Sequence, residues 1–344
     1  MDRDKEQKLN QFCQELVEIE SRLQQIFQEI TLLGSNSTNS CCTNIETINE
    51  LCNTSPSESK IRLFRSLFRG REDVYARRFE STRTGKSGYQ PSCKNEWATG
   101  ICGKPRTKCA DCNYREYLPI TDHVIKWHLR GNNPEEYGDK DFTIGIYPML
   151  PDENCWFLAA DFDKLTWQDD IRAYAKTCAE MDIPIVVERS RSGNGGHVWM
   201  FFDEPIPCMK ARAIGSYILT ETMEHRPELG LDSYDRFFPN QDTLPQGGLG
   251  NLIALPLQKK PRESGNSVFL DEDFEPYPDQ WQYLSTISKI GRDRIETLFK
   301  NACDKGKIIG LQMPITEEDD KPWELPPSGK KKSQIIGPFL KVLR

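Results

Sequence analysis

Two aspartates at the end of an apolar run are suited to binding a divalent metal ion. Residues 156–162 read WFLAADF, which predicts a buried strand, and Asp163 follows directly. Because strand side chains alternate between two faces, Asp161 and Asp163 should point the same way while Phe162 enters the core. Neighbouring carboxylates repel each other, and Mg²⁺ or Mn²⁺, which prefer oxygen ligands, would remove that conflict. The pair alone is not decisive, since surface turns, sugar-nucleotide transferases and nucleases also carry it.

A glycine-rich turn between the next two predicted strands could hold an anion. The stretch 188–197 reads ERSRSGNGGH and joins the apolar runs 183–190 and 197–202. Glycines let backbone N–H groups approach an anion closely, and serine, arginine and histidine side chains add donors. The candidate phosphate ligands are Arg191, Ser192, Gly193, Gly195, Gly196 and His197. No Walker A lysine follows, and the alternative is a plain hairpin with a hydrogen-bonded histidine.

The order of these motifs resembles the archaeo-eukaryotic primase superfamily. A third acidic stretch, LDSYDRFFP (231–239), follows the acidic pair and the turn. The first motif of that superfamily is an acidic pair, the second centres on Ser and His, and the third is an Asp after a large residue. The stretches CKNEW, LAADFDK, ERSRSGNGGHVW, SYDRFFPNQDTLP, GGLGNLIALPLQ and NSVFLDEDFEPYPDQW resemble most closely the primase-polymerase domain of TOTE conflict systems and its CRISPR-associated relatives. The resemblance spans roughly residues 60 to 290.

The resemblance implies roles for individual residues. The acidic pair falls on the first motif, and Ser192 and His197 fall on the second. Asp235 fits the third motif better than Asp232, because the family frame reads Ser-Tyr-Asp-Arg. Asn251 and Lys259 lie on or just past the predicted strand 251–257, where the superfamily often places triphosphate contacts.

Four cysteines form a candidate zinc site. Their spacing is C-x8-C-x6-C-x2-C, at Cys93, Cys102, Cys109 and Cys112. Four thiolates suffice for a closed tetrahedral Zn²⁺ site, which would be structural. The alternatives are four unconnected thiols, or a site that uses His123 and His128. The related family carries cysteines in the same frame, which favours the all-cysteine zinc site.

The resemblance implies a DNA primase-polymerase, a nucleotidyl transferase. Asp161, Asp163 and Asp235 would hold two Mg²⁺ or Mn²⁺ ions, and nucleoside triphosphates would be joined on a DNA template, with RNA as a candidate primer. The net charge of −7 argues weakly against a nucleic-acid partner, but residues 60–115 hold fourteen Lys and Arg against five Asp and Glu. A metal-dependent nuclease and a non-catalytic, zinc-stabilised nucleic-acid-binding module stay open as alternatives.

The elements that position these residues alternate between strands and helices. Helices are expected over 61–79, 167–182, 208–225 and 285–305, with strands at 156–162, 183–190, 197–202 and 251–257. This pattern predicts an α+β or α/β fold with a mixed sheet, and the resemblance makes its catalytic core RRM-like. Thr166 is the expected N-cap of the second helix.

Five regions are expected along the chain. They are a coiled-coil helix (1–33), a flexible linker (34–59), a basic helical and zinc-binding subdomain (60–130), a primase-polymerase catalytic core (131–284), and a C-terminal helix and linker (285–344) leading to a further domain. Apolar residues spaced alternately three and four apart over 9–33 predict self-association into a homo-oligomer. The sequence holds no run of eighteen apolar residues and begins with a charged stretch, so we expect a cytoplasmic protein without a membrane partner.

Overall fold

The computed structural model describes residues 51–81, 85–135, 141–225, 231–244 and 247–305, together with Arg22. By its internal contacts the chain divides into two units, Met1–Asn49 and Glu50–Arg344, and the fold described below belongs to the second. Apart from Arg22, the predicted coiled-coil helix lies outside the described residues, as do linker residues 34–50 and the C-terminal linker from 306 onward.

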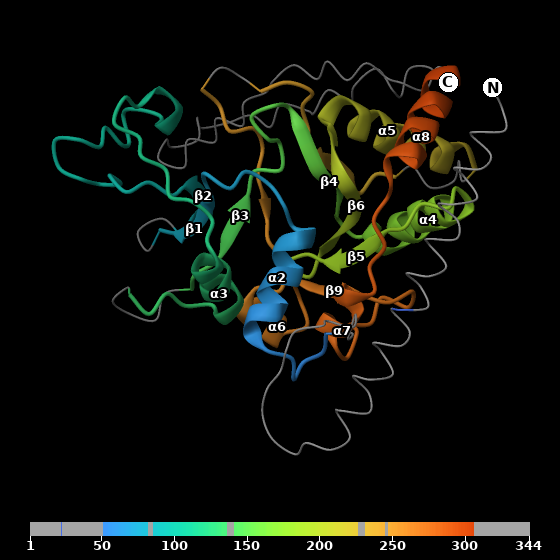
Figure 1. Ribbon diagram of the computed structural model, residues 1–344, viewed down its shortest axis with the longest axis horizontal. Helices are drawn as coiled ribbons and strands as arrows, with labels where there is room; N and C mark the ends of the chain where they lie inside the picture. The colour runs from blue at the N-terminus through green and yellow to red at the C-terminus, as the bar shows by residue number, and fades with distance from the viewer. Residues whose placement is uncertain are drawn as a thin grey trace. The chain divides into compact units, whose positions relative to one another are not determined.

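A five-stranded sheet carries the predicted motifs (Figure 1). Its strands are β4 (Asn154–Asp163), β5 (Val186–Arg189), β6 (Gly195–Pro207), β7 (Tyr234–Phe238) and β9 (Val268–Leu270), and they lie in the order β7-β4-β6-β5-β9. Helix α4 (Trp167–Glu180) connects β4 to β5, and α5 (Cys208–His225) connects β6 to β7. The order β4-α4-β5-β6-α5-β7 is the split β-α-β arrangement of ferredoxin-like folds.

The α+β class is confirmed, but the predicted mixed sheet is wrong. Every pairing between the named strands of the described residues is antiparallel. The reason is the tight turn between β5 and β6, which makes these two strands antiparallel neighbours. Strand β6 also pairs antiparallel with β4 on its other side, so no two strands that run in the same direction are adjacent.

Helices α4 and α5 cover one face of this sheet. A Cβ on Gly215 of α5 would lie 2.6 Å from Leu158 of β4, and one on Gly196 of β6 would lie 2.8 Å from Ile171 of α4. Side chains therefore interlock closely across this interface. The strands point Phe162 and Val198 to this face, so the neighbouring residues Asp161 and His197 point to the other one.

A second, smaller sheet has the order β2-β1-β3-β8. Its strands are β1 (Ala76–Glu80), β2 (Ser87–Pro91), β3 (Ile144–Ile146) and β8 (Ile253–Ala254). The helix expected over 61–79 is wrong in its second half, because α2 (Ser57–Leu67) ends early and β1 follows. The chain passes so close to β3 at Gly70 that a Cβ there would lie 2.5 Å from the carbonyl oxygen of Tyr147, and Val74 and Tyr75 favour extended structure.

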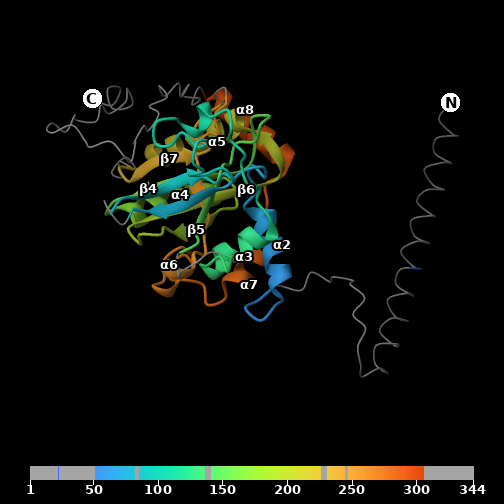
Figure 2. The same ribbon diagram turned by 90° about the vertical axis from the view of Figure 1, so that its left-hand side faces the viewer.

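The remaining elements pack around the two sheets. They are the short 3₁₀ turn η1 (Cys109–Asp111) and the helices α3 (Asp122–Arg130), α6 (Lys259–Glu263), α7 (Gln280–Ser285) and α8 (Arg292–Asp304). Helix α8 packs on α5, whereas α2 packs on α3 and α7 (Figure 2). None of the helices within the described ranges is both long and apolar enough to cross a membrane.

Aromatic side chains cover the sheet face that bears Asp161 and His197 further along the strands. The ring of Phe68, just after α2, lies 5.0 Å from that of Trp199 and 5.4 Å from that of Phe201, both on β6. The apolar part of this face is thereby buried, while the end of β4 that carries the aspartates stays accessible to solvent. A polar site thus lies at the edge of a rigid core, as a substrate site requires.

Candidate active site

Three carboxylates converge at the end of β4. Asp161, Asp163 and Asp235 each offer one oxygen, and the three oxygens all lie within 4.8 Å of one another. The first two share a face of β4 as the alternation of strand side chains predicts, and the third comes from the adjacent strand β7. Three oxygen donors this close together can hold a divalent cation.

A β-bulge brings Asp235 into this group. On β7, Arg236 pairs with Asp161 and Tyr234 pairs with Phe162, so Asp235 is the extra residue between them. A bulge of this kind turns its side chain toward the face of the neighbouring residue. The Asp235 carboxylate also accepts a hydrogen bond from Arg236 Nε at 2.8 Å.

Buried contacts hold the bulge in place. Asp170 on α4 is almost fully buried, and its Oδ2 accepts hydrogen bonds from the backbone N–H (3.1 Å) and the hydroxyl of Ser233. The Ser233 carbonyl in turn accepts from the N–H of Asp163 at 2.7 Å. Thr166 is the N-cap of α4 as predicted; its side chain makes no capping bond, and its hydroxyl donates to Asp170 at 3.2 Å. Helix α4 therefore positions the third acid.

The electrostatics of the group favour a bound cation. Burial, together with the like charges of Asp163 and Asp235, raises the pKa of Asp161 to about 6, against the opposing effect of His197. A cation placed among the three oxygens would offset both effects, so the residues present fit a divalent metal ion.

His197 stands beside the acidic group. It is the direct β6 partner of Asp161, and its Nε2 lies 3.6 Å from Asp161 Oδ1. Its other ring nitrogen, Nδ1, lies 2.9 Å from Oε2 of Glu188 on β5. Burial alone would lower the pKa of His197, but Glu188 and the nearby aspartates outweigh it and raise the pKa to about 9. The imidazole is therefore charged at neutral pH and can donate a proton in a hydrogen bond from Nε2.

Glu188 is a site residue to which the sequence analysis assigned no role. It is 1% exposed, and its Oε2 also accepts from Trp199 Nε1 at 3.0 Å. Its Oε1 accepts from the Ser267 hydroxyl at 3.4 Å. The feature that could have identified Glu188 from the sequence is the β5–β6 hairpin, whose register places residue 188 directly opposite residue 197. Glu188 thus fixes both the orientation and the charge of His197.

We expect Glu188→Gln to lower the pKa of His197 from about 9 by roughly one to two, because the charge-assisted hydrogen bond contributes about 1.5–3 kcal/mol. Histidine NMR titration measures this value directly. Glu272→Gln, at an exposed glutamate, is the matched control and should leave the titration unchanged. A His197 titration that is identical in the wild type and in Glu188→Gln would contradict the assigned contact.

The glycine-rich turn is tight. Its glycines allow close packing against neighbouring residues as well as the close approach of an anion to the backbone. Ser190 N donates to Gly195 O at 2.9 Å, and the Ser192 hydroxyl accepts from Asn194 N at 3.2 Å. A Cβ on Gly195 would collide with Asp163, and Gly193 has a positive φ of 79°. Gly196 faces α4, so its lack of a side chain allows close helix packing, and its part in anion binding stays a prediction.

Three other predicted phosphate ligands have partners elsewhere. Arg191 Nη2 lies 3.1 Å from Asp141 Oδ2, and its Nη1 donates to Gln258. The Asn251 amide bridges two backbone groups, since it accepts from residue 240 and donates to residue 237, each at 3.2 Å. Lys259 pairs with Glu263 at 2.6 Å on the short helix α6. A role for these three in binding triphosphate stays a prediction.

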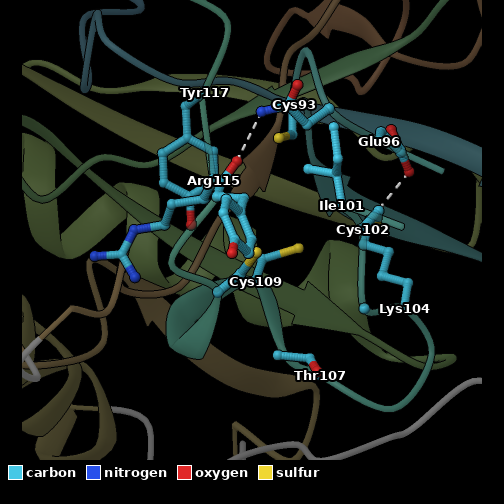
Figure 3. A pocket seen from close by; sticks show the side chains of 13 residues that line it. Cys93, Glu96, Ile101, Cys102, Lys104, Thr107, Cys109, Arg115 and Tyr117 are labelled. Carbon is cyan, nitrogen blue, oxygen red and sulfur yellow. Dashed lines mark hydrogen bonds and ion pairs between the residues drawn. The ribbon is translucent and has the colours of Figure 1, made fainter. Parts of the chain in front are cut away.

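The four predicted zinc ligands line one pocket in the loop between β2 and α3 (Figure 3). The backbone N–H of Glu116 donates to Cys93 Sγ at 3.4 Å. Burial raises the pKa of Cys109, while the nearby Lys104 ammonium opposes this. Among the described residues, no three of the cysteine sulfurs come within the 4.8 Å that the carboxylate oxygens reach.

The alternative histidine ligand, His128, takes no part in this pocket. It is fully buried, with Nδ1 accepting from Ile144 N at 3.2 Å and Nε2 lying 2.9 Å from the Pro256 carbonyl. Burial lowers its pKa to about 4, so the ring is neutral at pH 7. Both nitrogens are used by the backbone, which makes His128 a core residue.

Comparison with known proteins identifies a family and similar solved structures. Residues 59–298 match the family described as TOTE conflict system, Archaeo-Eukaryotic Primase domain. Among solved structures, the chain is similar to the polymerase domain of Mycobacterium tuberculosis Ligase D in complex with DNA. That match has 12% identity and a TM-score of 0.34, and it covers 73% of this chain and 86% of that one. No curated protein matches the sequence.

Proposed function

The chain belongs to the archaeo-eukaryotic primase domain family of TOTE conflict systems, and from that membership we propose that it is a template-dependent nucleotidyl transferase, a DNA primase-polymerase. The observation that carries this proposal is the convergence of Asp161, Asp163 and Asp235 within 4.8 Å, next to a charged histidine. Carboxylates that hold cations beside a cationic donor suit the transfer of a highly charged triphosphate.

In the proposed mechanism the three aspartates hold two Mg²⁺ or Mn²⁺ ions. When bound, these ions supply activation of a 3′-hydroxyl and stabilisation of the pyrophosphate that leaves. The protein supplies the geometry. Asp161 and Asp163 are fixed by strand β4, which is paired on both sides, and Asp235 is fixed through the buried contacts of Ser233. Rigid placement matters because phosphoryl transfer depends mainly on positioning and electrostatics.

The second part of the proposed site binds the triphosphate. His197 donates from Nε2 to a phosphate oxygen, because Glu188 already occupies its Nδ1. The buried Glu188 carboxylate raises the pKa of His197 and so favours a hydrogen-bond donor to phosphate over a general base. The Ser192 hydroxyl and the backbone of the 193–195 turn lie on the same hairpin and add neutral donors.

The proposed template path runs over the basic residues between 60 and 115. This segment holds fourteen Lys and Arg against five Asp and Glu, in a chain whose net charge is −7. Cationic side chains gathered in one segment neutralise phosphates without regard to sequence. A DNA template, and an RNA or DNA primer, are the proposed partners.

Incorporation of labelled nucleotide on a primed template tests the proposal. The assay uses dNTP and NTP pools, with and without primer, in Mg²⁺ and in Mn²⁺. We expect extension products that require template. Degradation of the template would indicate a nuclease instead, and binding with neither synthesis nor degradation would indicate a non-catalytic module.

We also propose that Cys93, Cys102, Cys109 and Cys112 bind one structural Zn²⁺. All four line one pocket, and thiolates are the ligands that zinc prefers. A closed four-cysteine site leaves no open position, so the ion would stabilise the loop between β2 and α3 without taking part in the reaction.

Cys109→Ser should reduce the zinc content from about one ion per chain to near zero and lower the thermal midpoint by several degrees. Elemental analysis and thermal unfolding measure the two effects. Cys303→Ser changes an exposed cysteine on α8 and should alter neither quantity. Freshly purified, unchelated wild-type protein without zinc would overturn the assignment.

A further inference from the structure

Exposed apolar side chains gather on the cysteine loop. Five large hydrophobic residues among the described ones are exposed, and three of them lie in this loop. Trp97 is 63% exposed, Tyr114 is 64% exposed and Ile101 is 44% exposed. Isolated exposed apolar residues are ordinary, but a concentration of them in one loop marks an interaction surface.

The loop holds these rings in fixed positions. Segments 93–95 and 114–117 are tied together, since Lys94 N donates to Glu116 O at 2.8 Å and Asn95 Nδ2 donates to Tyr114 O at 2.8 Å. Trp97 has a positive φ of 60°, a conformation that is rare for a bulky residue, and Lys104 Nζ lies 5.6 Å from its ring centroid. This backbone conformation costs energy that the rest of the loop must offset, which makes Trp97 a candidate functional position.

The charge around the rings indicates the kind of partner. Exposed basic residues stand in the same loop at Lys94, Arg106, Lys108 and Arg115, against two exposed acids, Asp111 and Glu116, the second of which pairs with Lys94. Aromatic rings among basic side chains are how proteins bind single strands, because the rings stack on unpaired bases and the cations contact phosphates. A duplex offers no free base faces, and an apolar protein partner would have no need of the cations.

We propose that Trp97 and Tyr114 form a stacking surface for unpaired bases of a single-stranded nucleic acid, with Ile101 beside them. This inference rests on the proposed template-dependent function and specifies which part of the chain binds the unpaired strand. The loop extends from β2 beyond the smaller sheet (teal in Figure 1), where a single-stranded nucleic acid can reach it. Ile101 and Tyr114 also line the cysteine pocket, whereas Trp97 is not among its lining residues.

The test measures affinity for a fluorescent oligothymidylate and for a duplex of the same length. Trp97→Ala with Tyr114→Ala should weaken single-strand binding by roughly tenfold or more, since each stacked ring contributes about 1–3 kcal/mol. The affinity for duplex should stay at the wild-type value. The dependence of affinity on salt concentration should also be unchanged, because the variant loses no phosphate contact. Met209→Ala, at an exposed apolar residue on α5, is the matched control.

If the alanine variant is unstable, variants that retain an aromatic ring still test the inference. Trp97→Phe and Tyr114→Phe should bind the single strand nearly as the wild type does. Stacking should also quench tryptophan emission in the wild type more than in Trp97→Phe. Wild-type affinity in a folded alanine variant, an equal loss for duplex, or equal quenching in Trp97→Phe would each overturn the inference.

The inference and the proposed function can fail separately. If the wild type incorporates nucleotides while the ring variants bind the single strand normally, the stacking surface is wrong and the polymerase assignment stands. If the wild type incorporates nothing while the ring variants lose single-strand binding, the surface is right and the polymerase assignment falls.

Discussion

Replacing Asp161 and Asp163 together by alanine is expected to abolish nucleotide incorporation while leaving the protein folded. The two side chains supply two of the three oxygens that converge within 4.8 Å. Without them one carboxylate remains, which is too few to hold two ions. We expect a loss of about a thousandfold or more, because metal ions contribute several kcal/mol of transition-state stabilisation. Single-turnover extension of a labelled primer measures it.

Stability separates a catalytic defect from a folding defect. Burial and like charge both raise the pKa of Asp161, so in the absence of metal its ionised form works against folding at neutral pH. Its folded pKa of about 6 lies above the ordinary 3.8, so this penalty is absent at low pH and develops as the pH rises through that interval. The thermal midpoint of the double variant at pH 7 without divalent ions should therefore not fall.

The third acid offers an internal control. Asp235→Ala should be inactive, because its side chain is turned into the site by the bulge. Asp232→Ala should be active, because that exposed residue lies before the bulge and outside the acidic group. Near wild-type extension by the double variant or by Asp235→Ala would show that the catalytic assignment is wrong.

The acidic pair could be predicted from the sequence because it depends on local geometry alone. Strand alternation fixes which residues share a face, and the apolar run around Phe162 identifies a buried strand. The nearness of Asp235 was not predictable from spacing, since it depends on a bulge and on the tie between Asp170 and Ser233. Only the resemblance distinguished Asp235 from Asp232.

Glu188 shows why a site can be incomplete when it is derived from sequence. A glutamate followed by arginine and serine looks like the polar end of a strand. Its burial results from neighbours that are distant in sequence: β6 on one side, and Ser267 just before β9 on the other. Its role as the partner of His197 appears only when these strands are assembled.

The incorrect predictions have the same origin. The sheet was expected to be mixed because strands alternate with helices, but the placement of β6 between β4 and β5 is a long-range property. The basic helix was expected to reach residue 79, but it ends at Leu67, and the chain then passes close to the smaller sheet at Gly70, a long-range contact.

Replacing His197 by alanine is expected to weaken triphosphate binding by about one to two orders of magnitude. The charged imidazole is the proposed donor to a phosphate, and such a contact contributes roughly 1.5–3 kcal/mol. Affinity for template should barely change, because the basic segment and the exposed loop are untouched. Titrations with a nucleoside triphosphate and with template strand on the same variant give both values. His225→Ala, at an exposed histidine on α5, is the matched control.

A second variant separates phosphate binding from the structural contact with Glu188. Alanine removes both ring nitrogens and leaves a buried carboxylate with only the Trp199 and Ser267 donors, so part of its effect can come from lost stability. Asparagine at 197 can place an amide N–H where Nδ1 stood, which restores the donor to Glu188 but supplies nothing at Nε2. His197→Asn should therefore regain thermal stability and still bind triphosphate weakly. If template binding collapses in these variants while triphosphate affinity stays at the wild-type value, the hairpin belongs to the template path and the polymerase site proposed above has no triphosphate donor.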